Sequence, residues 1–313
     1  IFKYLKNLGY KISFEKSIDK NLISNALKTS QIVLLENLRF WPEEKANNIE
    51  FAQKLKELAE YYVNDAFGVL HRSDTSITLL PSLYESNKKT IGLLIEKELF
   101  ELSKIKDNPA RPLTLILGGG KVKDKLVLIE GLMQKIDSVI LCPALVFTVL
   151  KAQGFEIGSS LIDPNLLIYA NKLIKIAKDN NVKLIFPDDF LVSCKSMNGD
   201  LSYKNLTDLK DSDFGISIGP KSLTNFEHEI INAKTIFFNC AMGFFERPET
   251  LEPLGKLLEI MSKSKSYTVI GGGDSVAAVQ YFGLENQINF LSTGGGATLE
   301  FLSGKILPGL KYL

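Results

Sequence analysis

The stretch YTVIGGGDSVAAV, at residues 267–279, limits the fold of this chain more than any other part of the sequence. Its first four residues are aromatic, β-branched or apolar and predict a short buried strand. The three glycines that follow allow a turn in which the backbone can approach a ligand closely. Asp274 and Ser275 then stand at the start of a small-residue helix, where both residue types cap well. Strand, glycine loop and helix in this order indicate one unit of an α/β fold.

The same stretch is a candidate anion site. A helix N-terminus offers free N–H groups and a partial positive charge, and both suit phosphate. The carboxylate of Asp274 would repel phosphate unless a cation lay between them, and Mg²⁺ is the usual cation. The stretch therefore suggests a site for phosphate or a Mg-nucleotide. Taken alone, an ordinary strand–loop–helix corner with a capping Asp explains it slightly better.

Strands and helices alternate regularly through the second half of the chain. This alternation predicts a parallel sheet covered by helices on both faces. The expected strands are residues 113–117, 138–141, 183–186, 235–238, 267–270 and 290–292, and the expected helices are 123–134, 144–151, 165–178 and 251–261. Residues 195–213 are polar and predict an irregular surface excursion.

The first half alternates in the same way, with shorter segments. The expected helices are 2–8, 22–27 and 49–60, and the expected strands are 11–14, 32–38 and 61–67. The run at 32–38 is largely apolar and β-branched, so it predicts a buried strand. Residues 90–106 predict one long, highly charged helix that ends before Pro109. We place the boundary between two domains along this helix.

Composition and charge exclude several classes of protein. The chain has 313 residues, enough for two domains, and its 45% hydrophobic and 23% charged residues are close to the globular average. A net charge of +1 gives no support for nucleic acid or an acidic membrane surface as a partner. No apolar run reaches the length of a membrane span.

The cysteines indicate a reducing compartment, and the first residue indicates that the chain is part of a longer one. Cys142, Cys194 and Cys240 are far apart, which argues against a disulfide framework or a zinc site and fits a reducing cytoplasm. The chain begins at Ile1 and shows no signal-peptide pattern, so we expect it to be a piece of a longer chain.

Unusual residues follow four of the expected strands in the second half. They are glycines 118–120 with Lys121 and Lys125, Asn239 with Gly243 and Glu246, glycines 271–273 with Asp274, and glycines 294–296. Ligands of an open parallel sheet bind outside the carboxyl ends of its strands, so this set predicts a phosphate-bearing ligand. Neither a Walker sequence nor a G-x-G-x-x-G fingerprint follows any strand, which excludes a P-loop and a dinucleotide fingerprint.

Two arginines of the first half are candidates for a second anion site. Arg39 and Arg72 each follow an expected strand, and the guanidinium fork matches phosphate or carboxylate. Salt bridges to Glu36 or Asp65 explain these arginines equally well. His71 could serve as an acid or base, but a packed loop histidine is the commoner case.

The strand ends, in this order, resemble those of phosphoglycerate kinases. The matching segments include LLENLRFWPEEK, YYVNDAFGVLHR, LGGGKVKDK, NCAMGFFE, IGGGDSVAAV and STGGGATLEFLSGKILPG, with their spacing kept from about Lys11 onward. The resemblance implies two doubly wound, Rossmann-like α/β domains joined by a long hinge helix. It divides the chain into a partial N-terminal 3-phosphoglycerate domain at 1–94, an interdomain helix at 95–108, a nucleotide-binding domain at 109–292, and a segment at 293–313 that packs back toward the first domain.

The resemblance also implies an activity. This is reversible phosphoryl transfer between 1,3-bisphosphoglycerate and Mg-ADP in glycolysis, giving 3-phosphoglycerate and ATP, carried out by a monomer whose domains close around the hinge. The implied residues are Arg39 and Arg72 for phosphoglycerate, Lys121, Lys125, Gly294 and Gly295 for the transferred phosphoryl group, Asp274 for Mg²⁺, Glu246 for the ribose, and Gly119, Gly120, Lys125, Asn239, Gly243, Gly272, Gly273 and Ser275 for the rest of the nucleotide. Phosphoryl transfer needs positioning and charge neutralisation more than a covalent residue, which agrees with these residue types.

Several positions depart from the family pattern. The family's opening segment, which completes the phosphoglycerate site, has no counterpart here. The substitutions are Asp74 for His, Gly120 for Ala, Lys123 for Ser, Cys142, Pro143 and Ala144 for three glycines near the adenine, Ser217 for Asp, and Cys240 and Ala241 for Gly-Pro. The charged residues of the implied nucleotide site are intact, which favours a divergent but active enzyme. The alternatives are a non-catalytic nucleotide-binding or scaffold protein and, less favoured, a kinase for another small molecule.

Overall fold

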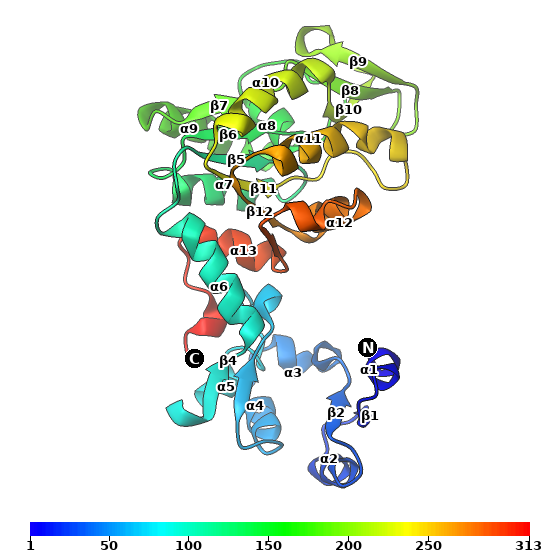
Figure 1. Cartoon of the computed structure of the whole chain (residues 1–313), viewed down its shortest axis with the longest axis vertical. Helices are drawn as coiled ribbons and strands as arrows, with labels where there is room; N and C mark the ends of the chain where they lie inside the picture. Colours follow the sequence, from blue (N-terminus) through cyan, green and yellow to red (C-terminus); the bar gives the residue numbers. More distant parts are fainter. The chain divides into compact units, whose positions relative to one another are not determined.

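The computed structural model describes residues 1–313 and separates into two compact units (Figure 1). Unit 1 comprises Ile1–Lys97 and Ile306–Leu313, and unit 2 comprises Glu98–Lys305. The division falls inside helix α6 (Leu93–Lys106), so this single helix contributes residues to both units. Among all the helices, none has the length and apolar character that a crossing of the bilayer requires.

Unit 2 is built around a six-stranded parallel sheet with the strand order β13-β12-β11-β5-β6-β7. The strands are β5 (Leu113–Leu117), β6 (Ser138–Leu141), β7 (Lys183–Ile185), β11 (Thr235–Asn239), β12 (Tyr267–Gly271) and β13 (Phe290–Ser292). Every residue of β5, β6 and β11 is buried, as apolar strands covered on both faces should be. The prediction of a parallel α/β sheet is confirmed, and each predicted strand ends within one residue of its observed end.

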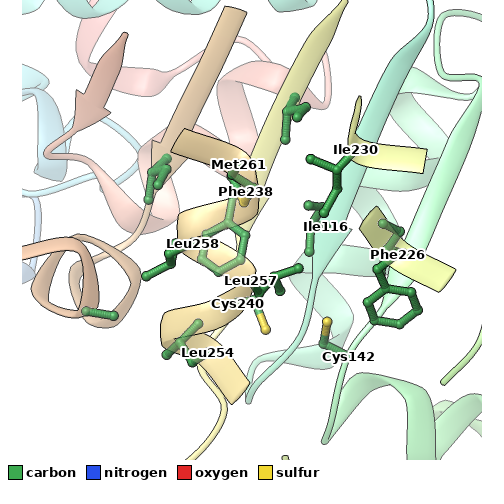
Figure 2. Close-up of a cluster of buried hydrophobic side chains, with 14 of the residues drawn as sticks. Ile116, Cys142, Phe226, Ile230, Phe238, Cys240, Leu254, Leu257, Leu258 and Met261 are labelled. Atoms are coloured by element: carbon green, nitrogen blue, oxygen red, sulfur yellow. The ribbon is translucent and has the colours of Figure 1, made fainter. Parts of the chain in front are cut away.

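Helices cover both faces of this sheet. One face packs against α10 (Pro220–Asn232), α11 (Glu252–Lys263) and α12 (Gly273–Tyr281). The core between them is drawn in Figure 2 and includes Ile116, Cys142, Phe226, Ile230, Phe238, Cys240, Leu254, Leu257, Leu258 and Met261. The sulfur-bearing side chains of Cys142 and Cys240 thus belong to the hydrophobic core.

The opposite face carries α7 (Val122–Leu132) and α13 (Gly295–Leu302). These two helices meet closely, because a side chain at Gly131 of α7 would come within 2.3 Å of the Ser303 carbonyl oxygen. Two further helices, α8 (Leu145–Ala152) and α9 (Leu167–Asp179), pack against each other beside the sheet. Helices α7, α8 and α9 lie at or near their predicted positions, whereas α13 was not predicted. Together they complete the layered arrangement.

A second, antiparallel sheet in unit 2 has the order β10-β8-β9. Its strands are β8 (Asp189–Cys194), β9 (Leu201–Asn205) and β10 (Asp213–Ile218). The prediction that residues 195–213 are irregular is therefore wrong. Strand β9 lies at the edge of the sheet and carries polar residues, so it lacks the apolar run that marks a buried strand. One of them, Lys204, reaches Asp213 Oδ1 with its Nζ at 2.8 Å.

Unit 1 contains two small parallel sheets, β1 (Ile12–Glu15) with β2 (Ile32–Leu35), and β3 (Tyr62–Asn64) with β4 (Lys89–Ile91). Its helices are α1 (Phe2–Asn7), α2 (Lys20–Leu27), α3 (Pro42–Lys45), α4 (Ile49–Lys56) and α5 (Leu79–Ser82), besides the first residues of α6.

Three predictions for unit 1 need correction. The expected buried strand at 32–38 is shorter and only partly buried, because β2 pairs with β1 alone and its first residue, Ile32, is 36% exposed. The expected helix at 90–106 begins only at Leu93, and strand β4 occupies the residues before Gly92. The helix expected at 49–60 ends at Lys56. Short elements such as β4 give too few residues for a periodic pattern to appear.

Candidate functional site

A pocket of about 210 Å³ opens in unit 2 where β5, β11, β12 and β13 end. These four strands are neighbours in the sheet, so their following loops meet at one edge. We call this cavity the glycine-lined pocket. It is lined by Gly118, Gly119, Gly120, Lys121, Lys125, Asn239, Cys240, Ala241, Gly272, Gly273, Asp274, Ser275, Gly295, Gly296 and Leu299. Most residues that the sequence proposed for a nucleotide are thus brought together by the fold.

Three helices begin at the glycine-lined pocket. They are α7, α12 and α13, and none of them has a side chain that caps its first turn by a hydrogen bond. Their N-terminal N–H groups and the positive ends of their dipoles therefore favour an anion. Two glycine amides are already used, because Gly118 N donates to Asn239 O at 3.1 Å and Gly119 N donates to Pro143 O at 2.7 Å. The convergence of uncapped helix N-termini makes phosphate the ligand that suits the pocket best.

Lys125 supplies a buried positive charge to this pocket. It is only 5% exposed, and its Nζ donates to the carbonyl oxygen of Gly120. Burial lowers the pKa of Lys125 below its usual value, while the carboxylates of Asp124 and Asp274 oppose that shift. An ammonium group held in a desolvated pocket by one carbonyl has donors left for an anionic ligand. The neighbouring Lys121 is exposed and adopts a left-handed conformation with φ of 56°.

Asn239 and Ser275 hold the loops of the pocket to each other. Asn239 Nδ2 donates to Gly271 O at 2.6 Å, which joins the ends of β11 and β12. The Ser275 hydroxyl donates to Cys240 O at 3.0 Å and accepts from Cys240 N at 3.1 Å. In this arrangement the Ser275 side chain is fully occupied in fixing the start of α12 to the loop after β11.

Asp274 is the residue that could hold a metal ion. It is exposed in the first turn of α12 and lines the glycine-lined pocket. The chain contains no cluster of three or more His, Cys, Asp or Glu side chains that could form an all-protein metal cage. Mg²⁺ is commonly held by one or two carboxylates together with phosphate oxygens, so a single carboxylate facing a phosphate pocket fits Mg²⁺ in this role.

Glu98 is a supporting residue that the sequence did not reveal. Although it is 0% exposed, its carboxylate accepts hydrogen bonds from Ser292 Oγ at 2.8 Å and from Thr293 N and Oγ1, both at 2.7 Å. These bonds fix the segment that leads into Gly294 and α13. Gly294 itself is buried, and its N–H is directed to Ser292 Oγ at 3.4 Å. A glutamate in a charged helix carries no signal that would single it out.

A second cavity of about 290 Å³ adjoins the first, and we call it the apolar pocket. It is lined by Gly119, Gly120, Pro143, Ala144, Leu161, Phe214, Gly215, Ile216, Ala241, Met242, Gly243, Phe244, Phe245, Glu246 and Asp274. Gly243 and Glu246 therefore lie here and not in the glycine-lined pocket. Aromatic and aliphatic walls with two carboxylates, Glu246 and Asp274, suit the planar, partly polar body of a nucleoside.

Ala144 gives the apolar pocket an unusual backbone. Its φ of 66° and ψ of −57° lie outside the regions that L-residues normally occupy. Ala144 stands where the sequence resemblance places a glycine, so the methyl group is present in a conformation that favours glycine. Such strain persists only where surrounding structure enforces it.

In unit 1, Arg39 lies in the short helical turn Leu38–Phe40 and its Nε is 3.6 Å from Asp74 Oδ2. The suggested partners Glu36 and Asp65 do not pair with Arg39. Asp65 instead caps α6, because its Oδ1 accepts from Leu94 N at 2.8 Å and from Ile95 N at 3.1 Å. Arg39 is thereby held against the loop that also carries Arg72.

The fold and the pockets define a class of protein. A parallel α/β sheet with uncapped helix N-termini, a buried lysine and a carboxylate at its carboxyl edge is typical of enzymes that handle Mg-nucleotides and transfer phosphoryl groups.

Comparison with known proteins identifies the family. The sequence profile of the family described as phosphoglycerate kinase matches residues 1–305. Phosphoglycerate kinase of Dictyoglomus turgidum is 42% identical over 294 residues, which cover 93% of this chain and 73% of that protein. The enzyme of Pseudothermotoga lettingae is 40% identical over 321 residues, covering 100% of this chain and 80% of that protein. The chain belongs to the phosphoglycerate kinase family.

Solved structures agree with this assignment. Phosphoglycerate kinase from Coxiella burnetii is 34% identical and superposes with a TM-score of 0.79, covering 90% of this chain and 73% of that one. Phosphoglycerate kinase from Pyrococcus horikoshii is 26% identical, with a TM-score of 0.83 over 99% of this chain and 79% of that one.

Proposed function

We propose that this chain catalyses reversible phosphoryl transfer between 1,3-bisphosphoglycerate and Mg-ADP, giving 3-phosphoglycerate and ATP. The observation that carries this proposal is the match of residues 1–305 to the phosphoglycerate kinase family. The glycine-lined pocket supports it, because it gathers cationic side chains and helix N-termini at one sheet edge. Nothing in the comparisons favours the non-catalytic alternative.

In the proposed mechanism, the residues of the glycine-lined pocket neutralise charge on the transferred phosphoryl group. Lys125 would donate hydrogen bonds to that group, and the more exposed Lys121 would balance charge as the transition state forms. The first turn of α13, at Gly295, would offer N–H groups from a fixed direction. Because these donors are part of a rigid sheet edge, little reorganisation is needed when charge develops.

Asp274 would hold Mg²⁺ against the nucleotide phosphates. The ion would supply further charge neutralisation there. Asn239, Gly272 and Gly273 would border the phosphates, and Glu246 in the apolar pocket would accept hydrogen bonds from the ribose hydroxyls. Each assignment is supported by the place of the residue in one of the two pockets.

The acceptor would be bound by residues 1–94. Arg39 and Arg72 would grip 3-phosphoglycerate, since guanidinium groups bind phosphate and carboxylate in a fork. Asp74 lies against Arg39 and would have to release it, or share it, when the anion binds. We further propose that residues 95–108 act as the interdomain helix, that residues 109–292 hold the nucleotide and that 293–313 pack back toward the first domain, with hinge closure excluding water during transfer.

The proposed setting is the cytoplasm, and the proposed state is a monomer. All three cysteines are free, which fits a reducing compartment.

An assay of phosphoryl transfer from Mg-ATP to 3-phosphoglycerate tests the proposal. The full-length gene product is mixed with Mg-ATP, and formation of ADP is followed with and without 3-phosphoglycerate. We expect ADP only when the acceptor is present. Lys125→Ala should lower kcat by about 10²–10³-fold, because it removes a preorganised donor to the phosphoryl group.

Lys263→Ala is the matched control for this assay. Lys263 is exposed and its Nζ lies 3.6 Å from Glu259 Oε2, so its loss should leave kcat unchanged. Absence of acceptor-dependent ADP from a folded protein would refute the proposed reaction. An unchanged rate for Lys125→Ala would refute the role given to that lysine.

A further inference from the structure

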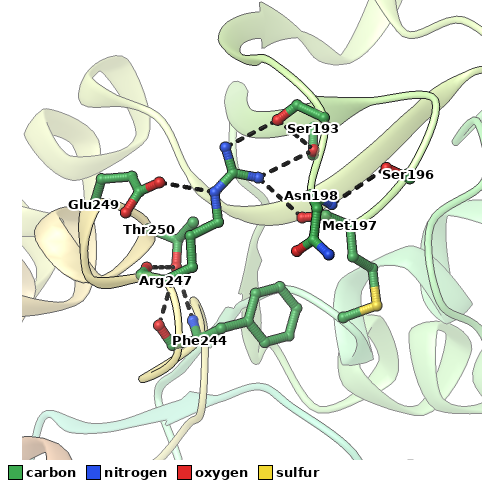
Figure 3. A network of polar contacts seen from close by, with 9 residues as sticks. Ser193, Ser196, Met197, Asn198, Phe244, Arg247, Glu249 and Thr250 are labelled. Atoms are coloured by element: carbon green, nitrogen blue, oxygen red, sulfur yellow. Dashed lines mark hydrogen bonds and ion pairs between the residues drawn. The ribbon is translucent and has the colours of Figure 1, made fainter.

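Arg247 follows directly after Glu246 but lines neither pocket. Figure 3 shows its guanidinium group pointing toward the turn that connects β8 and β9. Nη1 donates to Met197 O and Nη2 to Gly199 O, both at 2.9 Å, and Nη1 also reaches Ser193 Oγ at 3.4 Å. The side chain is 19% exposed. One arginine therefore binds a single turn of the antiparallel sheet through three acceptors.

The backbone of Arg247 closes a second turn. Arg247 N donates to Phe244 O at 2.9 Å, and Arg247 O accepts from Thr250 N at 2.9 Å and from Thr250 Oγ1 at 2.7 Å. Phe244 N in turn donates to Thr250 Oγ1 at 2.8 Å. Thr250 is fully buried, and its hydrogen bonds to Phe244 and Arg247 hold this turn in one conformation. Side chain and main chain of the same residue thus join two turns that are about 50 positions apart, as the separation of Arg247 from Met197 shows.

The second turn carries one wall of the apolar pocket, and the first turn belongs to the sheet that carries another wall. Phe214 and Ile216, on strand β10, form one wall, and the segment from Phe244 to Glu246 forms the other. Strand β10 pairs with β8, and β8 pairs with β9, so the first wall and the β8–β9 turn are parts of one sheet. Gly243 N donates to Ile216 O at 3.2 Å and so fixes the start of the Phe244–Glu246 segment to β10, while Arg247 fixes its end to the β8–β9 turn. The two attachments together set the position of the wall.

A simple surface ion pair does not account for this arrangement. Arg247 Nε lies 2.8 Å from Glu249 Oε1, but Glu249 is 57% exposed, and exposed pairs contribute little. The bonds to the two carbonyl oxygens are charge-assisted and come from a mostly buried group, which makes them stronger. Without Arg247 the carbonyl groups of Met197 and Gly199 would lose this donor.

We propose that Arg247 is a positioning residue that holds the Phe244–Glu246 wall against the antiparallel sheet and thereby sets the affinity for the nucleoside part of the nucleotide. This inference rests on the proposed function of the apolar pocket as a nucleoside site. Arg247 acts through Glu246 and the two phenylalanines before it, and it touches no substrate. Its loss should therefore weaken the binding of the nucleoside and leave the phosphate end of the site unchanged.

Arg247→Met tests the proposal, because it keeps an unbranched apolar stem and removes the guanidinium donors. Calorimetry would measure the affinities for Mg-ADP and for Mg-pyrophosphate, which can occupy only the phosphate end. We expect Mg-ADP to bind about tenfold more weakly, the equivalent of about one lost hydrogen bond of 1.4 kcal/mol, with pyrophosphate affinity unchanged. In turnover, KM for Mg-ATP should rise by a similar factor, with kcat and KM for 3-phosphoglycerate within about twofold.

Arg111→Met is the matched control. The guanidinium of Arg111 also binds protein acceptors, with Nη2 2.6 Å from Asp137 Oδ1, but it precedes β5 and lies away from the carboxyl edge of the sheet. This variant should lose stability at most, with both affinities unchanged. Arg247→Lys should recover part of the Mg-ADP affinity, because an ammonium group can reach one carbonyl but cannot fork between two.

The outcomes separate this proposal from the proposed reaction. A folded Arg247→Met protein with wild-type Mg-ADP affinity, or with ADP and pyrophosphate weakened equally, overturns the role of Arg247. If that variant does not fold, Arg247→Lys decides by the same ratio of affinities. A wild-type protein that binds Mg-ADP without transferring phosphate to 3-phosphoglycerate refutes the reaction, while the calorimetry still decides the role of Arg247. A wild-type protein that binds neither ligand overturns both.

Discussion

The glycine-lined pocket and the apolar pocket share Gly119, Gly120, Ala241 and Asp274, yet different parts of the fold build them. The first consists of loops that follow four adjacent parallel strands, and it offers main-chain N–H groups and charged side chains. The second adds strand β10 of the antiparallel sheet and a turn braced by Arg247. Charge for a phosphate and shape for a nucleoside are therefore provided by separate structures.

The departures from the family pattern affect the two pockets unequally. In the glycine-lined pocket the lysines and Asp274 are kept, and the side chain of Cys240 points into the hydrophobic core beside Cys142 (Figure 2). A hydrogen bond with Cys240, together with burial, raises the pKa of the Cys142 thiol, so it remains neutral. Gly120 and Ala241 line both pockets, whereas Pro143 and Ala144 line the apolar pocket alone. Substitutions should therefore divide into those that act on phosphate and those that act on the nucleoside.

The largest effect should come from the carboxylate of the glycine-lined pocket. Asp274→Asn removes the charge proposed to hold Mg²⁺, and we expect kcat/KM to fall by about 10²–10³-fold. Because the amide still offers one oxygen, a high Mg²⁺ concentration should restore part of the activity. Titration of the rate with Mg²⁺ measures this directly. An Asp274→Asn protein with the wild-type Mg²⁺ requirement would refute the role of Asp274 as the Mg²⁺ ligand.

A glycine in the first pocket should tolerate no side chain. Gly272 has φ of 99°, and a Cβ there would come within 2.5 Å of Asn239 Nδ2. We expect Gly272→Ala to lower the free energy of unfolding by about 2–3 kcal/mol, from backbone strain and displacement of Asn239. Urea unfolding would measure it.

Gly283→Ala is the control for Gly272→Ala. Gly283 also has a positive φ, of 66°, but no atom lies within 4 Å of its Cβ position. It should show the strain alone, about 1 kcal/mol. Equal losses for the two variants would mean that the contact between Gly272 and Asn239 has no energetic weight.

A smaller, selective effect is expected at the apolar pocket. Glu246→Gln should weaken Mg-ADP binding by about tenfold, because a neutral amide accepts hydrogen bonds from ribose hydroxyls less strongly than a carboxylate. An ADP analogue that lacks both ribose hydroxyls should bind the wild type and the variant alike. Calorimetry with the two ligands isolates the interaction. If both ligands lose affinity equally, Glu246 does not contact the ribose.

The sequence predicted the glycine-lined pocket better than the apolar pocket, because the two pockets are built from different kinds of segment. The run Leu113–Leu117 coincides with β5 because a strand buried on both faces needs uninterrupted apolar residues. Parallel strands end at a common edge, so the gathering of Lys125, Asn239 and Asp274 in one pocket followed from their positions after strands. These three residues could therefore be assigned to one site without knowing which distant segments contact each other.

The second pocket was harder to predict because it depends on contacts between distant segments. Strand β9 is polar and lies at an edge, so Leu201–Asn205 resembled a loop. Arg247 binds main-chain carbonyl groups at Met197 and Gly199, and any residue type can present a carbonyl. Nor does an alanine reveal in sequence that its φ is positive, as it is at Ala144.

Ala144 gives the smallest expected effect and the most direct comparison of the pockets. In the glycine-lined pocket the positive-φ residues are Gly119, Gly272 and Lys121, and Lys121 lies in the ordinary left-handed region with ψ of 47°. In the apolar pocket Ala144 combines a positive φ with a ψ of −57°, outside that region. Ala144→Gly should raise the free energy of unfolding by about 1 kcal/mol, because relief of strain exceeds the added freedom of the unfolded chain. Ala241→Gly, at a position without a positive φ, should lower it by about 0.5–1 kcal/mol. If both variants were destabilised alike, the strain at Ala144 would carry no measurable free energy, and the two pockets would not differ in this respect.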